Sequence, residues 1–158
     1  MPRVSLALAD GVSVHVDECE GSSWEGGNVW PPAHELVSLI RNELQPAAAE
    51  VGALALEPSA AAASPLSVLE CGAGCGLVGL AAALLGARVV LSDLPVALPT
   101  LVSNAKLNGF EVAESTGSAD ASTAAAAESA VEVATLDWCA SVQPLLEDGR
   151  TFDLIVAS

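Results

Sequence analysis

Two short runs of aliphatic residues open the chain, at positions 4–8 and 12–16. In the second run valine occupies every other position, so one face of an extended strand would be apolar and the other polar. Asp10-Gly11 separates the two runs, and this dipeptide between strand-like segments is typical of a tight hairpin turn. The pattern therefore predicts an N-terminal β-hairpin and loop within residues 1–25.

Beyond the hairpin, apolar runs of strand length alternate with segments in which large apolar residues recur at helical spacing. Glycine or proline marks several of the boundaries, as at Pro31, Gly86 and Gly109. Strands that alternate with helices imply a parallel sheet with right-handed crossovers. The predicted fold class is therefore α/β, with helices on both faces of the sheet. The predicted strands are 67–71, 88–93, 131–136 and 152–157, and the predicted helices are 31–45, 77–85, 96–108 and 140–147.

Two tracts, 46–65 and 117–130, consist mainly of alanine with serine, threonine, proline and acidic residues. They offer few large apolar side chains, whose burial could not offset an ordering cost of about 1–2 kcal/mol per residue. The first tract is either a mobile linker or a frayed surface helix. We interpret both as low-complexity insertions in one domain that spans residues 26–158, and we expect them to be protease-sensitive.

Charge and composition narrow the classes of partner. The 158 residues suit one domain, and 20 acidic against 5 basic residues give a net charge of -15. This balance argues against nucleic acid and anionic membranes as main partners, because both bind through cationic side chains. No run approaches the roughly 20 apolar residues of a membrane-spanning helix. Four cysteines do not form a disulfide framework here, so we expect reduced thiols in a cytoplasmic protein, with the nucleus as a second location.

The most informative segment is 70–76, with the sequence ECGAGCG, which follows a predicted strand and opens a predicted helix. In such a turn, glycines let the backbone bend sharply and approach a ligand closely. Asp93 ends the next predicted strand, where a carboxylate can accept hydrogen bonds from both ribose hydroxyls of a nucleoside cofactor. Strand, glycine turn, helix, strand and acid together predict a nucleoside-cofactor site. Cys71-x-x-x-Cys75 has no histidine at a matching spacing, so we expect no metal.

Two cofactors compete for this turn. Gly74-x-Gly76-x-x-Gly79 matches the dinucleotide fingerprint, which would indicate a nicotinamide-dependent oxidoreductase. However, the first glycine of this fingerprint, Gly74, lies two residues into the turn. In addition, Glu70 lies just ahead of the turn. A pyrophosphate gains from a helix N-terminus and loses beside a carboxylate. S-adenosylmethionine has no phosphate and carries an α-amino group and a sulfonium, so Glu70 suits it better.

In the motif Glu70-x-Gly72-x-Gly74-x-Gly76, the chain resembles the seven-strand, class I S-adenosylmethionine-dependent methyltransferases. Within that class it is similar to the non-histone protein-lysine methyltransferases, which modify chaperones, elongation factors and similar proteins. The Val-Trp-Pro and Leu-Asp-Trp elements are the specific part, because generic methyltransferases lack them. The segments that carry the resemblance are 28–31 (NVWP), 68–79 (VLECGAGCGLVG), 92–95 (SDLP), 104–108 (NAKLN) and 136–138 (LDW).

The resemblance implies a Rossmann-like fold that binds S-adenosyl-L-methionine, and it assigns a role to particular residues. Trp30 would lie near the methionine end of the cofactor, and Asp93 would hold the ribose. Trp138 would pack on the adenine with Asp137 beside it, and Ala157 would close the cleft. No residue is assigned as a catalytic base. The full set of predicted cofactor-binding residues is Trp30, Glu70, Gly72, Ala73, Gly74, Asp93, Asp137, Trp138 and Ala157.

The resemblance also implies the reaction, which is methyl transfer to a lysine of a protein substrate. In the family the fourth strand runs into an acidic residue and, three places later, a tyrosine, and this pair helps to hold the lysine-binding mouth. This sequence stops before that pair, at Ser158. We therefore expect a fold that is incomplete at its C-terminus and a chain that transfers no methyl groups by itself. A non-catalytic module that binds the cofactor or a partner protein is a further alternative.

Overall fold

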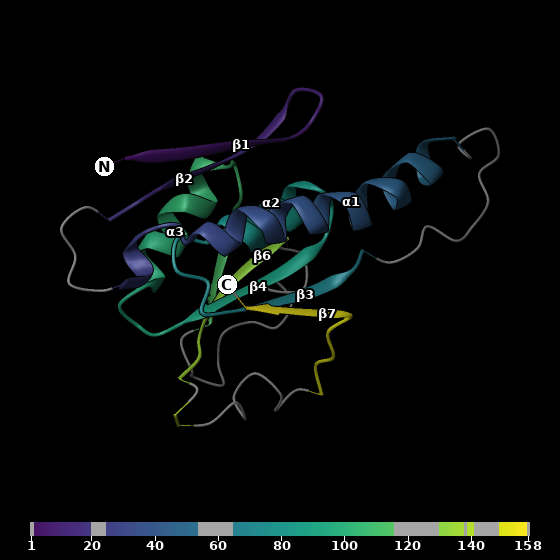
Figure 1. Cartoon of the computed structure of the whole chain (residues 1–158). Coiled ribbons are helices and arrows are strands. Elements are labelled where there is room, and N and C mark those ends of the chain that lie inside the picture. Colours follow the sequence, from purple (N-terminus) through teal and green to yellow (C-terminus); the bar gives the residue numbers. More distant parts are fainter. Residues whose placement is uncertain are drawn as a thin grey trace.

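The computed structural model describes residues 2–19, 25–53, 65–115, 130–137, 139–140 and 149–157 of the chain. At its centre is a five-stranded parallel sheet with the strand order β5-β6-β4-β3-β7 (Figure 1). The parallel α/β sheet that the sequence predicts is confirmed. The strands are β3 (Ser67–Cys71), β4 (Arg88–Asp93), β5 (Val112–Ser115), β6 (Val131–Thr135) and β7 (Leu154–Ala157).

The order of the strands changes direction at β3, and this reversal fixes where a ligand site can form. From β3 the sheet continues through β4 to β6, whereas β7 pairs with the opposite edge of β3. In open α/β sheets, ligands bind beyond the carboxyl ends of the strands at such a switch point. The glycine turn that follows β3 therefore lies where a cofactor site is expected.

Three α-helices pack on one face of the sheet (Figure 1). They are α1 (Pro31–Ala53), α2 (Leu77–Leu84) and α3 (Leu98–Leu107). Because α2 and α3 belong to crossovers that run in the same direction across the sheet, right-handed connections place both helices on the same side. Apart from Ala140, which lies in a turn, the helix expected at 140–147 falls outside the described residues, so helices on both faces stay a prediction.

The predicted N-terminal hairpin is confirmed. It consists of β1 (Arg3–Ala9) and β2 (Val12–Asp17), which pair antiparallel around a turn where Gly11 has a φ of 76°. Strand β2 packs against α2 and α3 on the side of these helices that faces away from the large sheet (Figure 1). The alternating valines explain this packing, since Val14 and Val16 are 0% exposed. The helices are thus enclosed between two sheets.

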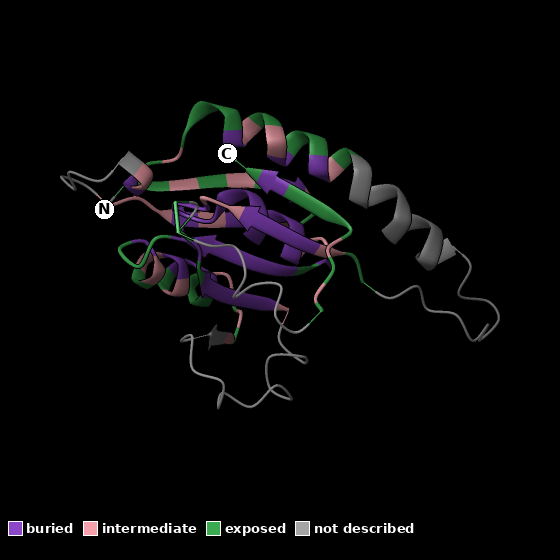
Figure 2. Ribbon diagram, turned by 90° about the horizontal axis from the view of Figure 1, so that it is seen from below, coloured by how far each residue is buried: buried purple, intermediate pink, exposed green. Residues whose placement is uncertain are grey.

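The apolar core consists of a large cluster on the helix-covered face of the sheet and a small cluster on the other face. Leu80, Leu91 and Leu101 are fully buried in the large cluster. Successive strand residues point to opposite faces, so a central strand that is covered on both sides is apolar along its whole length. Figure 2 shows that the central strands are buried along most of their length. The small cluster contains Leu69, Val90, Ala134 and Leu136.

Two elements differ from the prediction. Helix α1 continues to Ala53, past the Gln45-Pro46 step at which it was expected to end. Proline is unfavourable in the interior of a helix, but alanine, which occupies the next three positions, is the strongest helix former. The helix continues through Pro46 and through these alanines. Strand β5, which pairs in parallel with β6 at the sheet edge, was not predicted. Its four residues are too short a run to show a period in the sequence.

Within the described residues, none of the helices combines the length and the apolar character that a membrane crossing requires.

Candidate functional site

The turn after β3 has a conformation that requires glycine. Gly72, Gly74 and Gly76 have φ values of 66°, 55° and 82°, which place all three in the left-handed region that other residues rarely adopt. A Cβ at Gly74 would also lie 2.9 Å from the carbonyl oxygen of Gly26. The glycines therefore serve both the sharp bend of the turn and the close approach of a second backbone segment.

Short hydrogen bonds hold the turn against the neighbouring strand. The Gly74 N–H donates to Oδ2 of Asp93 at 2.7 Å, and the Ala73 N–H donates to the carbonyl oxygen of Ser92 at 3.0 Å. Within the turn, the Gly76 N–H donates to the Ala73 carbonyl oxygen at 2.7 Å. These three hydrogen bonds hold the backbone between β3 and α2.

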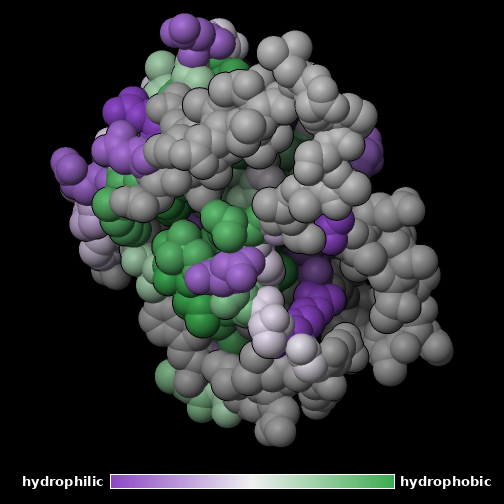
Figure 3. Space-filling view, turned by 90° about the vertical axis from the view of Figure 1, so that its right-hand side faces the viewer, coloured by the Kyte–Doolittle hydropathy of each residue, from purple (hydrophilic) through white to green (hydrophobic). Residues whose placement is uncertain are grey.

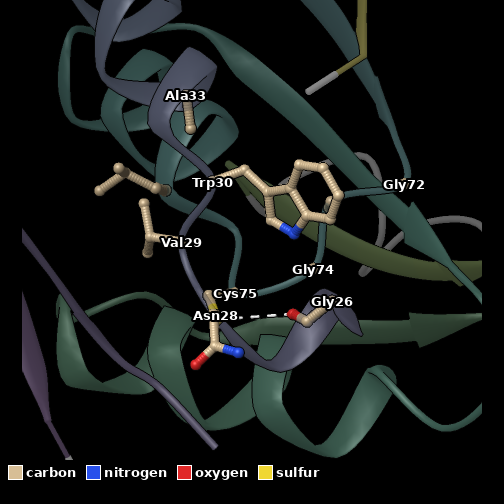
Figure 4. Close-up of a pocket in the computed structure, with 10 residues that line it drawn as sticks. Gly26, Asn28, Val29, Trp30, Ala33, Gly72, Gly74 and Cys75 are labelled. Carbon is tan, nitrogen blue, oxygen red and sulfur yellow. Dashed lines mark hydrogen bonds between the residues drawn. The ribbon is translucent and has the colours of Figure 1, made fainter. Parts of the chain in front are cut away.

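A surface hollow that is partly open to solvent lies over this turn. On its other side is the segment that leads from η1 (Glu25–Gly27) into α1. Figure 4 shows the indole of Trp30 extending across the hollow towards Gly72. Trp30 is 50% exposed at this position. The hollow is lined by Gly26, Asn28, Val29, Trp30, Ala33, Gly72, Ala73, Gly74, Cys75 and Leu77.

Cys75 joins the two walls of the hollow. Its buried thiol donates to the carbonyl oxygen of Gly27 at 3.3 Å and lies 3.7 Å from that of Gly26 (Figure 4). Burial raises the pKa of this thiol from 9.0 to about 12, and the charges of Cys19 and Glu18 add to the effect. The sulfur therefore stays protonated at neutral pH and acts as a hydrogen-bond donor. It is not suited to act as a nucleophile or metal ligand, because those roles require a thiolate.

Asp93 lies at the carboxyl end of β4 and is 8% exposed. Its Oδ2 accepts from the Gly74 N–H at 2.7 Å, and its Oδ1 accepts from the Leu94 N–H at 2.6 Å. A carboxylate offers about four acceptor positions, so each oxygen can accept one more hydrogen bond. The two backbone donors fix the orientation of the carboxylate, which can therefore accept hydrogen bonds from hydroxyl groups of a ligand.

Glu70 has a different environment from the one expected of a ligand. Its side chain is fully buried, and its Oε2 accepts from the Gly79 N–H at 2.8 Å in the first turn of α2. It is not among the residues that line the hollow. The structure thus shows Glu70 anchoring the start of α2, whereas its predicted contact with a cofactor stays a prediction.

The remaining predicted residues lie along the same edge of the sheet or outside the described part. Asp137 follows β6 and is exposed, and its Oδ1 accepts from the Cys139 N–H at 2.8 Å. The preceding Leu136 N–H donates to the Asp93 carbonyl oxygen at 2.9 Å, so the ends of β4 and β6 adjoin. Ala157 is paired with Cys71, one residue before the glycine turn. Trp138 lies outside the described residues.

Six residues that line the hollow were not predicted as site residues, namely Gly26, Asn28, Val29, Ala33, Cys75 and Leu77. The NVWP segment provided a signal for two of them, because it carries part of the family resemblance that assigned Trp30. The sequence pattern did not show that residues 26–29 face the glycine turn. In the part of the chain that the structure describes, no group of three His, Cys, Asp or Glu side chains is arranged to hold a metal ion.

A parallel sheet with a glycine turn at its switch point and an acid at the end of the next strand defines a Rossmann-like, nucleoside-binding α/β fold. The crystal structure of the SAM-dependent methyltransferase from Agrobacterium tumefaciens has this fold, and 98% of the present chain superimposes on 39% of it with a TM-score of 0.56. The two sequences are 18% identical, so this similarity concerns the fold alone.

Sequence comparison places the chain more narrowly. A family model described as lysine methyltransferase matches residues 9–158, and the chain therefore belongs to the lysine methyltransferase family. Protein N-lysine methyltransferase METTL21A of Mus musculus is 49% identical over 61 residues, which are 39% of this chain and 28% of the mouse protein. The matched regions thus make up less than half of both relatives.

Family membership implies S-adenosylmethionine as the cofactor, and the chemistry of the hollow fits it. Its lining combines backbone groups of the glycine turn with one large aromatic ring, and none of the described lining residues is lysine or arginine. A pyrophosphate would favour cationic partners. A cofactor with a cationic sulfonium and an ammonium group, and with no phosphate, has no such need.

Proposed function

We propose that this protein transfers a methyl group from S-adenosylmethionine to the ε-amino group of a lysine in a protein substrate. The observation that carries the proposal is the hollow over the glycine turn at the switch point of the sheet, in a chain of the lysine methyltransferase family. The mouse relative, named as a protein N-lysine methyltransferase, supports a protein as the substrate. We further propose that the protein works in the cytoplasm, where reducing conditions keep its cysteines as thiols.

The glycine turn, Trp30 and the residues that follow or end the neighbouring strands each have a role in this proposal. The Gly72–Gly74 backbone forms the floor beneath the cofactor, and Asp93 accepts hydrogen bonds from the ribose hydroxyls. The exposed indole of Trp30 covers the methionine end. Trp138 and Asp137 are proposed to contact the adenine, and Ala157 to border the cleft beside the glycine turn.

When bound, S-adenosylmethionine supplies a methyl group on a positively charged sulfur. The lone pair of a neutral lysine amine forms the new N–C bond as the S–C bond breaks, and the electron pair of that bond stays on sulfur. The product ammonium then loses its proton to solvent. Catalysis of such a displacement consists mainly of alignment of the reacting atoms. Apolar surroundings favour the neutral amine, because burial lowers the pKa of a lysine. We propose no general base.

Cofactor choice is tested by calorimetric titration of the protein with S-adenosylhomocysteine and, separately, with NADH. We expect S-adenosylhomocysteine to bind and NADH not to bind. Binding of NADH alone would favour the oxidoreductase alternative. Incubation of the whole protein to which this sequence belongs with radiolabelled S-adenosylmethionine and a dialysed lysate, followed by acid hydrolysis, should yield labelled methyl-lysine. Cofactor binding without labelled methyl-lysine would instead favour a non-catalytic module.

Asp93→Ala tests the site itself. We expect it to weaken S-adenosylhomocysteine binding at least about tenfold, which corresponds to a loss of about 1.4 kcal/mol. Asp153→Ala is the matched control, because Asp153 also accepts a backbone N–H, that of Ser67 at 2.8 Å. This contact lies at the amino ends of β3 and β7, whereas Asp93 lies at the carboxyl end of β4. The control should bind like the parent protein. Equal affinities of both variants would contradict the proposed role of Asp93.

Trp138→Ala tests the proposed contact with the adenine. We expect it to weaken S-adenosylhomocysteine binding to a similar extent as Asp93→Ala.

A further inference from the structure

Two asparagines one helical turn apart, Asn104 in α3 and Asn108 at its end, form hydrogen bonds with the backbone of the N-terminal hairpin. Oδ1 of Asn104 accepts from the Asp17 N–H at 2.9 Å, and its Nδ2 donates to the Asp17 carbonyl oxygen at 3.1 Å. Oδ1 of Asn108 accepts from the His15 N–H at 2.9 Å, and its Nδ2 donates to the His15 carbonyl oxygen at 2.5 Å. Each side-chain amide thus pairs with both polar groups of one strand residue.

The geometry of helix and strand explains why this arrangement fits. Four helical residues advance by about 6 Å, which is close to the roughly 6.7 Å spanned by two strand residues. Alternate residues of a strand direct their N–H and C=O groups towards the same edge. The two amides therefore satisfy one edge of β2 in the way that a neighbouring strand would, while β1 pairs with its other edge.

Asn104 makes one contact that Asn108 does not make. Its Nδ2 also donates to the Cys75 carbonyl oxygen at 2.9 Å, in the glycine turn under the hollow. The corresponding additional bond of Asn108 goes to the carbonyl oxygen of Asn104 at 2.7 Å, within its own helix. Asn104 is 1% exposed, so these bonds are formed away from water.

The peptide group that Asn104 holds is a critical one for the shape of the turn. The Cys75 carbonyl and the Gly76 N–H belong to the same planar unit, and this N–H donates to the Ala73 carbonyl oxygen at 2.7 Å. The next residue, Gly76, has a φ of 82° and caps the N-terminus of α2. Two hydrogen bonds thus fix the peptide plane from opposite ends, directly before the left-handed residue.

We infer that Asn104 is a positioning residue, which holds the glycine turn in its binding conformation and couples it to the docked hairpin. The inference rests on the proposed function, since it assigns Asn104 a part in cofactor binding through Cys75. The Cys75 side chain extends the same chain of contacts, because it donates to Gly27 in the opposite wall of the hollow. Asn104 would thereby fix both walls of the site without touching the ligand.

Asn104→Ala and Asn108→Ala form a matched pair for the test. Both variants lose a reciprocal amide pair with β2, so both should lower the melting temperature. Only Asn104→Ala should weaken S-adenosylhomocysteine binding, by about tenfold or more in calorimetry, while Asn108→Ala stays within about threefold of the parent. Only Asn104→Ala should shift the amide resonance of Gly76, whose peptide group loses its partner. Equal loss of affinity in both variants, or none in either, would overturn the inference.

A measurement on the parent protein covers the case in which Asn104→Ala does not fold. Addition of S-adenosylhomocysteine should slow hydrogen exchange of the Asn104 side-chain amide more than that of Asn108. Equal effects on the two amides would overturn the inference. If the parent protein binds no S-adenosylhomocysteine, the proposed function fails, and the Gly76 resonance of the two variants then decides whether Asn104 fixes the turn.

Discussion

Cys75 contributes both a buried side chain and a hydrogen bond to the candidate site. It is 3% exposed, and its thiol contacts the segment 26–27 that faces the glycine turn. The Gly27 carbonyl oxygen also accepts from the Cys19 N–H at 2.8 Å, so loss of the thiol would not leave it unpaired. The contribution of Cys75 is therefore that of a weak donor in a fixed position, which a hydroxyl could also supply.

Cys75→Thr should change S-adenosylhomocysteine affinity and stability little, because the threonine hydroxyl can donate in place of the thiol. Cys75→Val has nearly the same shape as Cys75→Thr but no donor. We expect the valine variant to be less stable than the threonine variant by about 0.5–1.5 kcal/mol, the usual net value of one hydrogen bond. Urea unfolding of both variants measures this difference. Equal midpoints would show that the thiol contributes only its volume.

The raised pKa of Cys75 predicts how stability depends on alkaline pH. As the pH rises above 9.0, the thiol of the unfolded chain loses its proton, while the folded protein keeps the proton until about pH 12. The unfolded state then binds fewer protons, so the free energy of unfolding falls by up to about 1.4 kcal/mol per pH unit. Cys75→Thr should lose less stability between pH 9 and 10.5 than the parent. Identical pH profiles would contradict this account.

At the scale of elements, helix α2 depends on a carboxylate from the strand before it. The helix is apolar almost throughout, and its N-cap, Gly76, makes no side-chain capping bond. Glu70 accepts the N–H of Gly79 instead, one of the donors that the first helical turn leaves without a partner in the helix. A negative charge also interacts favourably with the helix N-terminus. Gly79 allows this proximity, since a Cβ there would lie 2.6 Å from Oε2 of Glu70 and 2.3 Å from Leu91.

Glu70→Gln and Glu70→Leu separate the hydrogen bond from the charge. Glutamine keeps an acceptor for the Gly79 N–H but removes the charge, whereas leucine leaves a buried N–H without this acceptor. We expect unfolding midpoints in urea to fall in the order parent, Glu70→Gln, Glu70→Leu. The last step should cost about 1–3 kcal/mol, the value of an unsatisfied buried polar group. A leucine variant as stable as the glutamine variant would show that the bond to α2 contributes nothing.

At the scale of the whole molecule, the large sheet has an exposed edge at β7. Among the described strands, only β3 pairs with β7, and Ile155 is 62% exposed while Leu154 is 36% exposed. Figure 3 views the side of the molecule on the right of Figure 1 and shows hydrophobic residues gathered on that face. An exposed apolar edge strand favours pairing with another chain. The net charge of -15 opposes this through mutual repulsion, which salt screens.

We therefore expect the protein to self-associate at high concentration, and to do so more strongly as the salt concentration rises. Ile155→Lys should reduce this association, because a lysine on an edge strand is a natural barrier to pairing. Leu39→Lys is the control, since Leu39 is 55% exposed but belongs to helix α1 and not to an edge strand. Sedimentation velocity at several concentrations measures the effect. Equal behaviour of the two variants would exclude β7 as the associating edge.

The sequence by itself determined the features that depend on neighbouring residues. Alternating valines and Asp10-Gly11 specify the hairpin, and the apolar runs specify the strands β3, β4, β6 and β7. The ECGAGCG segment specifies a turn that only glycine can form. These signals are local, because side-chain period and allowed φ values are properties of a few consecutive residues. Hydrophobic pattern could not show the four residues of β5 or the extension of α1 beyond Pro46.

The tertiary structure alone decided which residues meet across the site. Cys75 contacts Gly27, 48 positions away, and Asn104 contacts Asp17, 87 positions away. Whether the buried Glu70 faces a helix or a ligand was also beyond the sequence, since a carboxylate beside a glycine turn suits either partner. The physical reason is that a polar side chain takes the partner that the folded chain brings within reach. That choice depends on how the elements pack, and no local pattern records it.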